Sequence, residues 1–323
     1  MAFVMGMLIP GLLFSVSEKL ISRQQLEIPS LESTDAVTQP TAPQEQQPTA
    51  GSGVLVQTAG DTLTQMDVQT YLTGVLLAEM PVDFDPEALK AQAVVARTYA
   101  LRSNSVGKKH PQGAVCTDAA CCQSYRSAED FLSKGGTPEL LAKVNAAVQS
   151  TDGQVLTYNG ALIEATYFSC SGGRTEDALA VWGTDIPYLQ AVDSPGEERA
   201  AHYVDTVQFT AAEFTAALGI SPTGAPADWL GAVTYTDGGG IDTMLIAGKT
   251  FSGITLRQKL GLRSTAITML AVGNTVHIST KGFGHRVGMS QYGAEAMAVG
   301  GSNYQEILAH YYPGTLLSRH TRN

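Results

Sequence analysis

The pattern of apolar and polar residues along the chain predicts a mixture of helices and short strands. Val68, Leu72, Val75 and Leu76 have the i, i+4, i+7, i+8 spacing of a helix with one buried face. Helices are predicted over residues 68–80, 86–102, 138–149, 210–218, 253–261, 289–298 and 304–311, and strands over 153–158, 161–168, 231–237, 242–248, 266–272 and 275–279. Because the two kinds of element alternate irregularly, we expect an α+β fold in which helices and short, mainly antiparallel strands surround a cleft.

Three element boundaries have clear local signals. Asp85 is a good N-cap and Pro86 suits the first helical position, so a helix is predicted to begin there. Pro81 disfavours helix at the residue before it, so the preceding helix is predicted to end close to Glu79. The Asp-Gly-Gly-Gly sequence at 237–240 predicts a hairpin turn, because glycine accepts a positive φ.

Composition divides the chain into three parts. Residues 1–16 are apolar and uncharged, which favours either a short membrane anchor or a signal peptide cleaved after small residues, and we expect an anchor or signal-like segment at 1–20. Residues 21–60 are rich in Gln, Pro, Thr and Ser and predict a flexible linker. Residues 61–317 are expected to fold, with about 205–275 as a candidate subdomain. Both interpretations of the first segment place the folded part outside the cytoplasm.

The charge of the chain excludes one broad class of partner. The 323 residues are 44% hydrophobic, which is enough for a sizeable core, and carry a formal net charge of −10. A nucleic-acid-binding protein normally shows a basic stripe or patch, so we expect no nucleic-acid partner.

Glu79 is the strongest candidate for acid–base chemistry. It lies near a predicted helix end, where the helix dipole and apolar neighbours raise the pKa of a carboxyl group and favour a protonated proton donor. Lys90 and Arg97 are seven residues apart on the next helix, so they lie on nearly one line and could grip an anionic or polyhydroxylated ligand. The alternative is a solvated Glu79 that pairs with one of these cations.

The cysteines have a spacing that suits either a metal or disulfides. His110, Cys116 and Cys122 form the series His-x5-Cys-x5-Cys, and imidazole with thiolates is a preferred ligand set for Zn²⁺. Cys121, Cys170 or water could supply a fourth ligand. Disulfides are the alternative, because four cysteines in an extracytoplasmic protein permit pairing.

Two further segments carry polar groups. In residues 282–295 a glycine loop leads to a helix capped by Ser290, and His285, Gln291 and Tyr292 offer hydrogen-bond donors for sugar hydroxyl or acetamido groups. The alternative there is a tight turn in which His285 is structural. Residues 167–177 lack the pattern G-x-S-x-G, so we expect no serine nucleophile and interpret them as a polar cleft wall.

These motifs resemble the stage II sporulation protein D family and, more broadly, the wall-active domain shared with amidase enhancer proteins. The motifs that carry the resemblance lie at residues 71–81, 88–99, 171–176, 261–265 and 284–293. The sequence departs from the pattern at Arg286, where many relatives have Gly, and at Cys170, where some have Thr or Ser.

The resemblance implies a peptidoglycan lytic transglycosylase, which cuts the β-1,4 bond between N-acetylmuramic acid and N-acetylglucosamine and leaves a 1,6-anhydro end. It implies Glu79 as the catalytic residue and Zn²⁺ held by His110, Cys116 and Cys122. Neither Glu176 nor Glu197 is an obvious second carboxylate, although both are candidates. Substrate contacts are expected from Lys90, Arg97, Tyr167, Ser169, Tyr188, His285, Ser290, Gln291 and Tyr292.

The resemblance also implies a cellular setting. The substrate would be peptidoglycan glycan strands, and the partners a cell-wall amidase and a membrane-anchored sporulation complex. A single N-terminal anchor would hold the protein in the cell membrane, with the catalytic domain extracytoplasmic, in the intermembrane space during engulfment. The alternative function is a non-enzymatic amidase enhancer or a wall-binding module.

Overall fold

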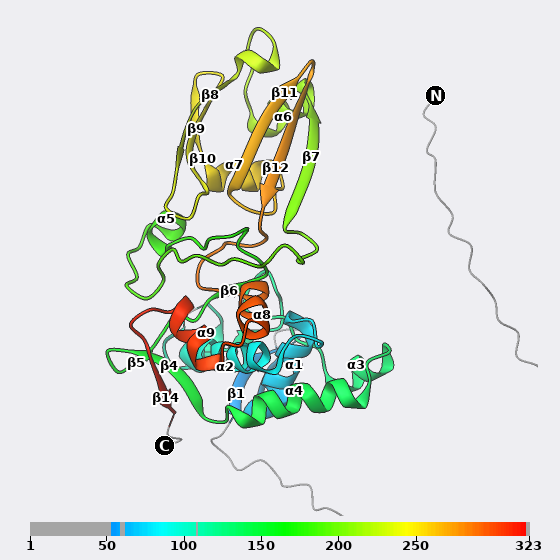
Figure 1. Cartoon of the computed structure of the whole chain (residues 1–323), viewed down its shortest axis with the longest axis vertical. Helices are drawn as coiled ribbons and strands as arrows, with labels where there is room; N and C mark the ends of the chain where they lie inside the picture. The colour runs from blue at the N-terminus through cyan, green and yellow to red at the C-terminus, as the bar shows by residue number, and fades with distance from the viewer. Residues whose placement is uncertain (1–52, 59–61, 108, 321–323) are drawn as a thin grey trace, which may run out of the picture. The chain divides into compact units, whose positions relative to one another are not determined.

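Helices alternate with small sheets along the chain, and most of the strand pairs are antiparallel (Figure 1). The computed structural model describes residues 53–58, 62–107 and 109–320. These residues belong to one unit that begins at residue 48. The arrangement confirms the α+β prediction.

The first hydrophobic core surrounds helix α2 (Pro86–Val106). Asp85 caps this helix by accepting a hydrogen bond from the Glu87 N–H at 2.8 Å, and Pro86 occupies its first turn, as predicted. Several alanines on α2 are fully buried, which allows close approach of neighbouring helices. Those that pack against it are α1 (Val68–Glu79), α4 (Pro138–Ser150), α8 (Gln291–Val299) and α9 (Tyr304–Tyr311).

Three small sheets border this core. Their strands are β1 (Gly53–Gln57) between β2 (Leu63–Asp67) and β3 (Val115–Cys116), β4 (Gln154–Tyr158) between β14 (Leu316–Arg319) and β5 (Ala161–Leu162), and β6 (Tyr167–Phe168) parallel to β13 (Met289–Ser290). The shorter elements in the same part of the chain are η2 (Pro111–Gly113), α3 (Ala128–Ser133) and α5 (Ala178–Trp182).

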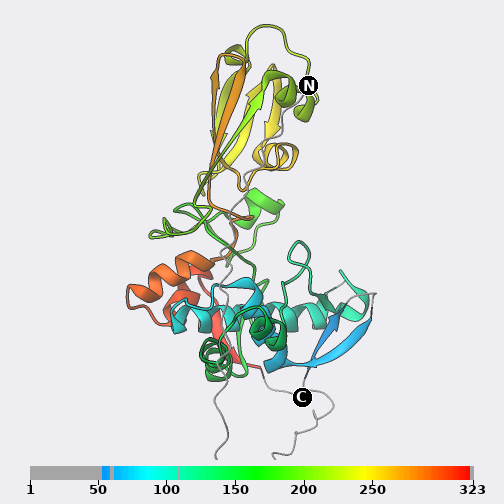
Figure 2. The same ribbon diagram turned by 90° about the vertical axis from the view of Figure 1, so that its right-hand side faces the viewer.

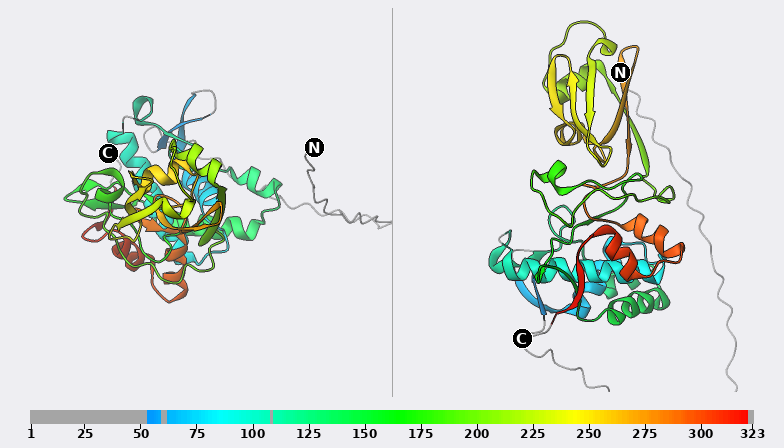
Figure 3. Two further views of the ribbon diagram at one scale, coloured as in Figure 1. Left: turned by 90° about the horizontal axis from the view of Figure 1, so that it is seen from above. Right: turned by 60° about the vertical axis from the view of Figure 1, so that its left-hand side comes forward.

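A second hydrophobic core lies within residues 214–278 and is enclosed by two three-stranded sheets (Figures 1 and 2). The strand orders are β11 (Ala266–Val272), β12 (Thr275–Lys281), β7 (Val204–Thr210), and β10 (Lys249–Ser252), β9 (Ile241–Ile246), β8 (Leu230–Tyr235). Helices α6 (Ala211–Leu218) and α7 (Gly253–Lys259) and the short η3 (Pro226–Asp228) complete it. Figure 3 shows the same elements from two further directions. That this segment is an independent subdomain stays a prediction.

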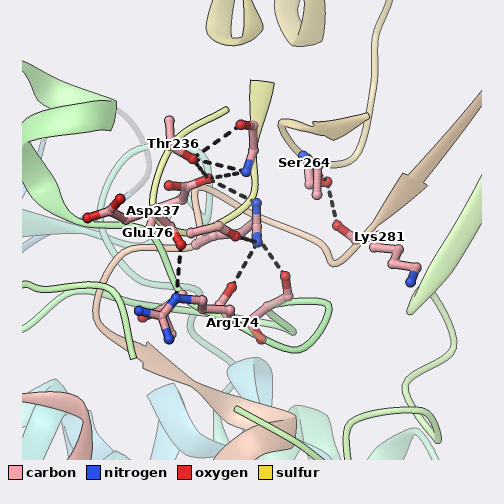
Figure 4. A network of polar contacts seen from close by, with 12 residues as sticks. Arg174, Glu176, Thr236, Asp237, Ser264 and Lys281 are labelled. Atoms are coloured by element: carbon pink, nitrogen blue, oxygen red, sulfur yellow. Dashed lines mark hydrogen bonds and ion pairs between the residues drawn. The ribbon is translucent and has the colours of Figure 1, made fainter. Parts of the chain in front are cut away.

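Glu176, in the loop before α5, forms a buried ion pair with Arg286, in the loop after β12, and both side chains bond to the turn of the β8–β9 hairpin. Figure 4 shows Glu176 beside Thr236 and Asp237 of that hairpin. Arg286 Nη1 lies 3.0 Å from Glu176 Oε1, and Arg286 also donates to the Gly238 carbonyl in the hairpin turn. Glu176 accepts from the Gly240 N–H at 3.0 Å. A Cβ at Gly238 or Gly240 would collide with the Glu176 carboxylate, so glycine here allows close approach as well as the predicted turn.

The sequence and the structure differ at several boundaries. Residues 53–57, placed in the linker by composition, form strand β1. The strand predicted over 161–168 is divided into β5 and β6. The helix predicted from residue 289 begins at 291, because residues 289–290 pair with β6. The strands β2, β3, β7, β10 and β14 and the short helices α3 and α5 were not predicted.

The expected anchor at residues 1–20 lies outside the described residues. Among the residues described, no helix combines the length and the apolar character that a bilayer-spanning helix needs.

Candidate functional site

Glu79 is the last residue of α1 and lies half-buried. The helix ends there because Met80 adopts an extended conformation ahead of Pro81, as the sequence predicted. The Glu79 carboxylate accepts a hydrogen bond from the Ser124 N–H, with 2.5 Å between nitrogen and Oε1. The chain therefore fixes one oxygen of this carboxyl group with a backbone donor.

The environment of Glu79 favours its protonated form. Burial, the largest influence, raises the pKa of Glu79 above its usual value. The neighbouring polar groups of Ser124, Tyr167 and Gln291 act in the opposite direction, because they stabilise the carboxylate, and of these the Ser124 N–H makes the hydrogen bond described above. Burial outweighs them, as a proton donor requires. Of the two cations considered as partners of Glu79, Lys90 instead contacts Glu87 at 2.5 Å, and Arg97 donates to the Gln154 and Val148 carbonyls.

Two short parallel strands bring Tyr167 and Gln291 to the same carboxyl group. In β6 and β13, Tyr167 pairs with Met289 and Phe168 with Ser290, and Gln291 follows directly at the start of α8. Burial and the nearby Glu79 carboxylate raise the pKa of Tyr167 well above its usual value, so its hydroxyl remains a proton-bearing donor. The structure thus brings together three predicted site residues that are far apart in the sequence.

His285 lies between aromatic rings and is a neutral hydrogen-bond acceptor. Its ring centroid is 5.6 Å from that of Phe168 and 5.6 Å from that of Trp182. The Val287 N–H donates to its Nδ1 at 3.1 Å. Burial, with the Arg257 charge as a smaller cause, lowers the pKa of His285 to about 4. These contacts favour the structural interpretation of His285.

Ser290 holds the start of α8 and is fully buried. Its Oγ accepts from the Gly293 N–H at 3.1 Å, as an N-cap does, and donates to Glu197 Oε1 at 2.5 Å. Nearby, Ser169 contributes its carbonyl, which accepts from the Tyr292 N–H at 3.0 Å. The placement of Ser290 favours an architectural role over a substrate contact.

The two aromatic residues Tyr292 and Tyr188 are partly exposed. The Tyr292 ring packs edge-on against Phe84, with centroids 5.0 Å apart. The Tyr188 hydroxyl accepts from the Glu164 N–H at 3.0 Å, and its ring lies 5.3 Å from that of Tyr158. These contacts of Tyr188 do not involve Glu79.

Lys90 and Arg97 do not form the expected clamp. Lys90 is half-buried, pairs with Glu87 and lies over the Tyr304 ring. Arg97 is only 1% exposed, and its guanidinium donates to the Gln154 carbonyl at 3.1 Å and to the Val148 carbonyl. This burial does not support a substrate contact for Arg97, which instead ties α2 to α4 and β4.

His110, Cys116, Cys121 and Cys122 gather into one cluster. Their four ligand atoms lie within 4.8 Å of one another, and His110 Nε2 lies 3.2 Å from Cys121 Sγ. None of the chain's cysteines forms a disulfide in the structure. Cys170 lies elsewhere, buried, with its thiol near the His202 carbonyl. Of the protein ligands considered for the fourth position, Cys121 therefore joins the cluster and Cys170 does not.

Neither alternative carboxylate is available to a substrate. Glu176 is fully buried in the ion pair with Arg286. Glu197 is 1% exposed and accepts hydrogen bonds from Ser171, Gly172, Ser194 and Ser290. Both carboxylates hold the surrounding structure together, so Glu79, which is half-buried, is the only one of the three that is not fully buried.

The sequence analysis missed the residues between the cysteines and the Glu79 carboxyl group. Ser124 donates to Glu79, and Gln123 is fully buried with its amide bonded to Tyr71 and Tyr167. Tyr125 packs so closely on α1 that a Cβ at Gly74 would collide with its ring. One signal was available, because all three residues follow Cys122 directly.

These features define a class of protein: an α+β domain with a half-buried carboxyl group at a helix end, next to a loop whose histidine and cysteine side chains are close enough together to hold a metal ion. A family model described as "Stage II sporulation protein" matches residues 57–158. The chain is 42% identical to stage II sporulation protein D of Bacillus subtilis (strain 168) over 268 residues, which cover 81% of this chain and 77% of that protein.

Two further relatives widen the comparison. Stage II sporulation protein D of Bacillus amyloliquefaciens is 40% identical, with the same coverage of both chains. The amidase enhancer of Bacillus subtilis (strain 168) is 30% identical over 76% of this chain and 40% of its own length. The chain belongs to the stage II sporulation protein D family, as its motifs indicated.

Proposed function

We propose that the protein is a peptidoglycan lytic transglycosylase that acts in sporulation, with Glu79 as its acid and base. The observation that carries the proposal is the single half-buried Glu79 carboxyl group, whose raised pKa favours the protonated form and whose Oε1 is held by Ser124. Membership of a sporulation family supports the setting.

The proposed reaction needs one carboxyl group and no added water. Protonated Glu79 gives its proton to the glycosidic oxygen between N-acetylmuramic acid and N-acetylglucosamine, and the C1–O bond breaks. The C6 hydroxyl of the muramic residue then attacks C1, and the Glu79 carboxylate removes the hydroxyl proton. The products are a 1,6-anhydro ring and a free 4-hydroxyl group, and Glu79 is protonated again.

The surroundings of Glu79 fit this sequence of proton transfers better than a two-carboxylate hydrolysis. A hydrolase needs a second carboxylate to activate water or attack the sugar. Glu176 and Glu197 are buried and bonded, and no carboxylate is among the main influences on the pKa of Glu79. Tyr167 and Gln291 would orient the carboxyl group and the reacting sugar, so that proximity supplies part of the rate.

The histidine and cysteine cluster fits Zn²⁺. A tetrahedral ion with Zn–S bonds of about 2.3 Å requires ligand atoms roughly 4 Å or less apart, close to the spacing of the four side chains. We propose that His110, Cys116 and Cys122 hold the ion and that Cys121 completes the set. A closed set of four protein ligands is typical of structural zinc, which would fix the loop that carries Ser124.

Product analysis tests the proposed function. The full-length protein, incubated with purified glycan strands, is expected to release fragments with 1,6-anhydro ends, which mass spectrometry separates from hydrolysed ends by the mass of one water. Glu79→Gln should reduce the release by about 10²–10⁴-fold, the usual contribution of a general acid and base. Glu139→Gln, at an exposed glutamate in the first turn of α4, is the matched control and should leave the rate unchanged.

One comparison favours a second function. A relative of this chain is called an amidase enhancer, so the protein could act by stimulating an amidase without cutting glycan. In that case no anhydro ends would form, while peptide release by an added cell-wall amidase would increase, and Glu79→Gln would retain the stimulation. That combination of results would reject the transglycosylase proposal.

We also propose that the domain works outside the cytoplasm on an N-terminal anchor, alongside an amidase in a sporulation complex. The apolar residues 1–16 and the polar linker that follows them support this location.

A further inference from the structure

A chain of buried hydrogen bonds leads from the body of α1 to Tyr167. The Tyr71 hydroxyl donates to Gln123 Oε1 at 2.9 Å, and Gln123 Nε2 donates to the Tyr167 hydroxyl at 3.1 Å. Tyr71 and Gln123 are both fully buried, so water does not compete for these groups. Tyr167 in turn lies close enough to Glu79 that its hydroxyl favours the carboxylate and so lowers the pKa of Glu79, while the charge of that carboxylate raises the pKa of Tyr167.

The chemistry of the Gln123 amide gives this series of hydrogen bonds a direction. A glutamine side chain has one accepting end and one donating end, and here the oxygen faces Tyr71 and the nitrogen faces Tyr167. Because the Tyr167 oxygen accepts from Gln123, the single Tyr167 hydroxyl hydrogen is not used in that bond. It is free to be donated to the Glu79 carboxylate. With the opposite amide orientation, the Tyr167 hydrogen would go to Gln123, and a lone pair would face the carboxylate.

We propose that Tyr71 and Gln123 are positioning residues, which hold the Tyr167 hydroxyl so that it donates to Glu79 throughout the reaction. The inference rests on the proposed function of Glu79 as acid and base. The same donor then serves both protonation states, because it can bond the carbonyl oxygen of the acid and either oxygen of the carboxylate. Cooperativity along this series of hydrogen bonds strengthens the last of them, from the Tyr167 hydroxyl to Glu79.

The position of Gln123 in the sequence explains how it is held. It lies between Cys122, a member of the histidine and cysteine cluster, and Ser124, the backbone donor to Glu79. Two consecutive residues therefore act on Glu79, one directly and one through Tyr167. The other titratable groups that act on Tyr167 are Tyr71 and Tyr99, and burial raises the pKa of both, so neither carries a charge at neutral pH.

A direct titration of Glu79 tests the proposal without any substrate. The full-length protein is labelled with ¹³C at the glutamate carboxyl carbon, and the Glu79 signal is assigned by its loss in Glu79→Gln. Tyr167→Phe should raise the pKa of Glu79 by about one unit, the effect of losing one hydrogen bond to a charged group. Gln123→Leu should raise it in the same direction by a smaller amount, and should add nothing further in the Tyr167→Phe background.

Tyr304→Phe is the matched control. It removes another tyrosine hydroxyl that donates to a glutamine oxygen at 2.9 Å, that of Gln154, and it lies outside the Glu79 site. Tyr71→Phe should raise the pKa of Glu79 and Tyr304→Phe should not, although both lose the same kind of bond. An unchanged Glu79 pKa in Gln123→Leu, or additive shifts in the double variant, would overturn the proposal.

The kinetic readout separates this inference from the proposed function. If the protein makes anhydro products, the basic limb of the pH profile of its kcat/KM should move to higher pH in Gln123→Leu. The reason is that Glu79 must be protonated for the first step, and a higher pKa keeps it protonated to a higher pH. If no such products form while the titration shifts appear, the transglycosylase proposal fails and the positioning role of Tyr71 and Gln123 stands. If products form and the titration is unchanged, the positioning role fails alone.

Discussion

Replacing Arg286 should destabilise the protein strongly, because its charge is buried in a site built around it. The guanidinium is 2% exposed and donates to the Ser171, Arg174 and Gly238 carbonyls at 2.6–2.8 Å, besides its contact with Glu176. Arg286→Met removes all of these donors. It also leaves the Glu176 carboxylate buried without its counter-charge.

The expected cost follows from these contacts. Removing one partner of a buried ion pair costs about 3–5 kcal/mol, a large fraction of the 5–15 kcal/mol that stabilise a typical domain. Glu176→Gln should cost less, about 1–3 kcal/mol, because the Arg286 charge that it leaves unpaired keeps three carbonyl acceptors and the amide oxygen still accepts from the Gly240 N–H. In the double variant the two costs should not add. We expect a coupling free energy of at least about 1 kcal/mol, since the second change removes the charge that the first left unpaired.

Trp229 allows the assay to follow the second core by itself. It is buried in that core, and Trp182 is the only other tryptophan in the sequence. In a Trp182→Phe background, urea denaturation is followed by Trp229 fluorescence and by far-UV circular dichroism. Because Arg286 and Glu176 join the β8–β9 hairpin to the loop before α5, the two signals should coincide in the parent protein and separate in Arg286→Met.

Two results would refute this reasoning. One is a loss below about 1 kcal/mol for Arg286→Met, which would mean that the buried charge is not held as the contacts indicate. The other is strict additivity of the two single variants, which would show that Arg286 and Glu176 do not stabilise each other. Arg174→Met, at the partly exposed arginine that pairs with Asp193, is the control and should cost less than about 1 kcal/mol.

Two further predictions concern the metal cluster and Glu79. Native mass spectrometry should find a single Zn²⁺ per chain. The ion should be lost in His110→Ala and Cys122→Ser, bound more weakly in Cys121→Ser and retained in Cys170→Ser. Equal Zn²⁺ binding by Cys121→Ser and the parent protein would exclude Cys121 as a ligand. The pKa of Glu79 is raised on folding, so its contribution to stability is present at acidic pH and is lost as the pH rises through the pKa of the folded protein. Glu79→Gln should therefore raise the melting temperature at pH 7, and this increase should disappear toward pH 4. Thermal denaturation of Glu79→Gln and the parent protein at the two pH values tests this prediction. A difference in melting temperature that grows toward pH 4 would contradict the raised pKa of Glu79.

The helices were predictable because their signals are local. The cap Asp85 defines the start of α2 and the breaker Pro81 defines the end of α1, each within a few residues, and both helices occur as expected. The strand β14 was not predictable, because it is four residues long and its partner β4 is far away in the sequence. The strand β7 did carry the alternating signal, with Val207 and Phe209 facing inward, but it holds few apolar residues and was missed.

The candidate site was predictable only in part, because spacing along a helix does not say what covers it. Lys90 and Arg97 do lie seven residues apart on α2, yet other helices and β4 surround that helix. Lys90 is therefore half-buried, whereas Arg97, on the same face of the helix, lies in the core. Glu79 was found because a helix end beside a proline is a local feature, whereas the Gln123 contacts depend on three distant segments meeting.

The order of residues between Cys116 and Ser124 connects the two chemical features of the site. The cluster side chains end at Cys122, and the next two residues supply the amide bonded to Tyr167 and the N–H bonded to Glu79. A displacement of this loop would therefore move both donors together. If the cluster holds a metal ion, removing the ion should alter the pKa of Glu79 even though no ligand of the cluster touches that carboxyl group. A metal that only stabilised the fold from a distance would leave the Glu79 titration unchanged.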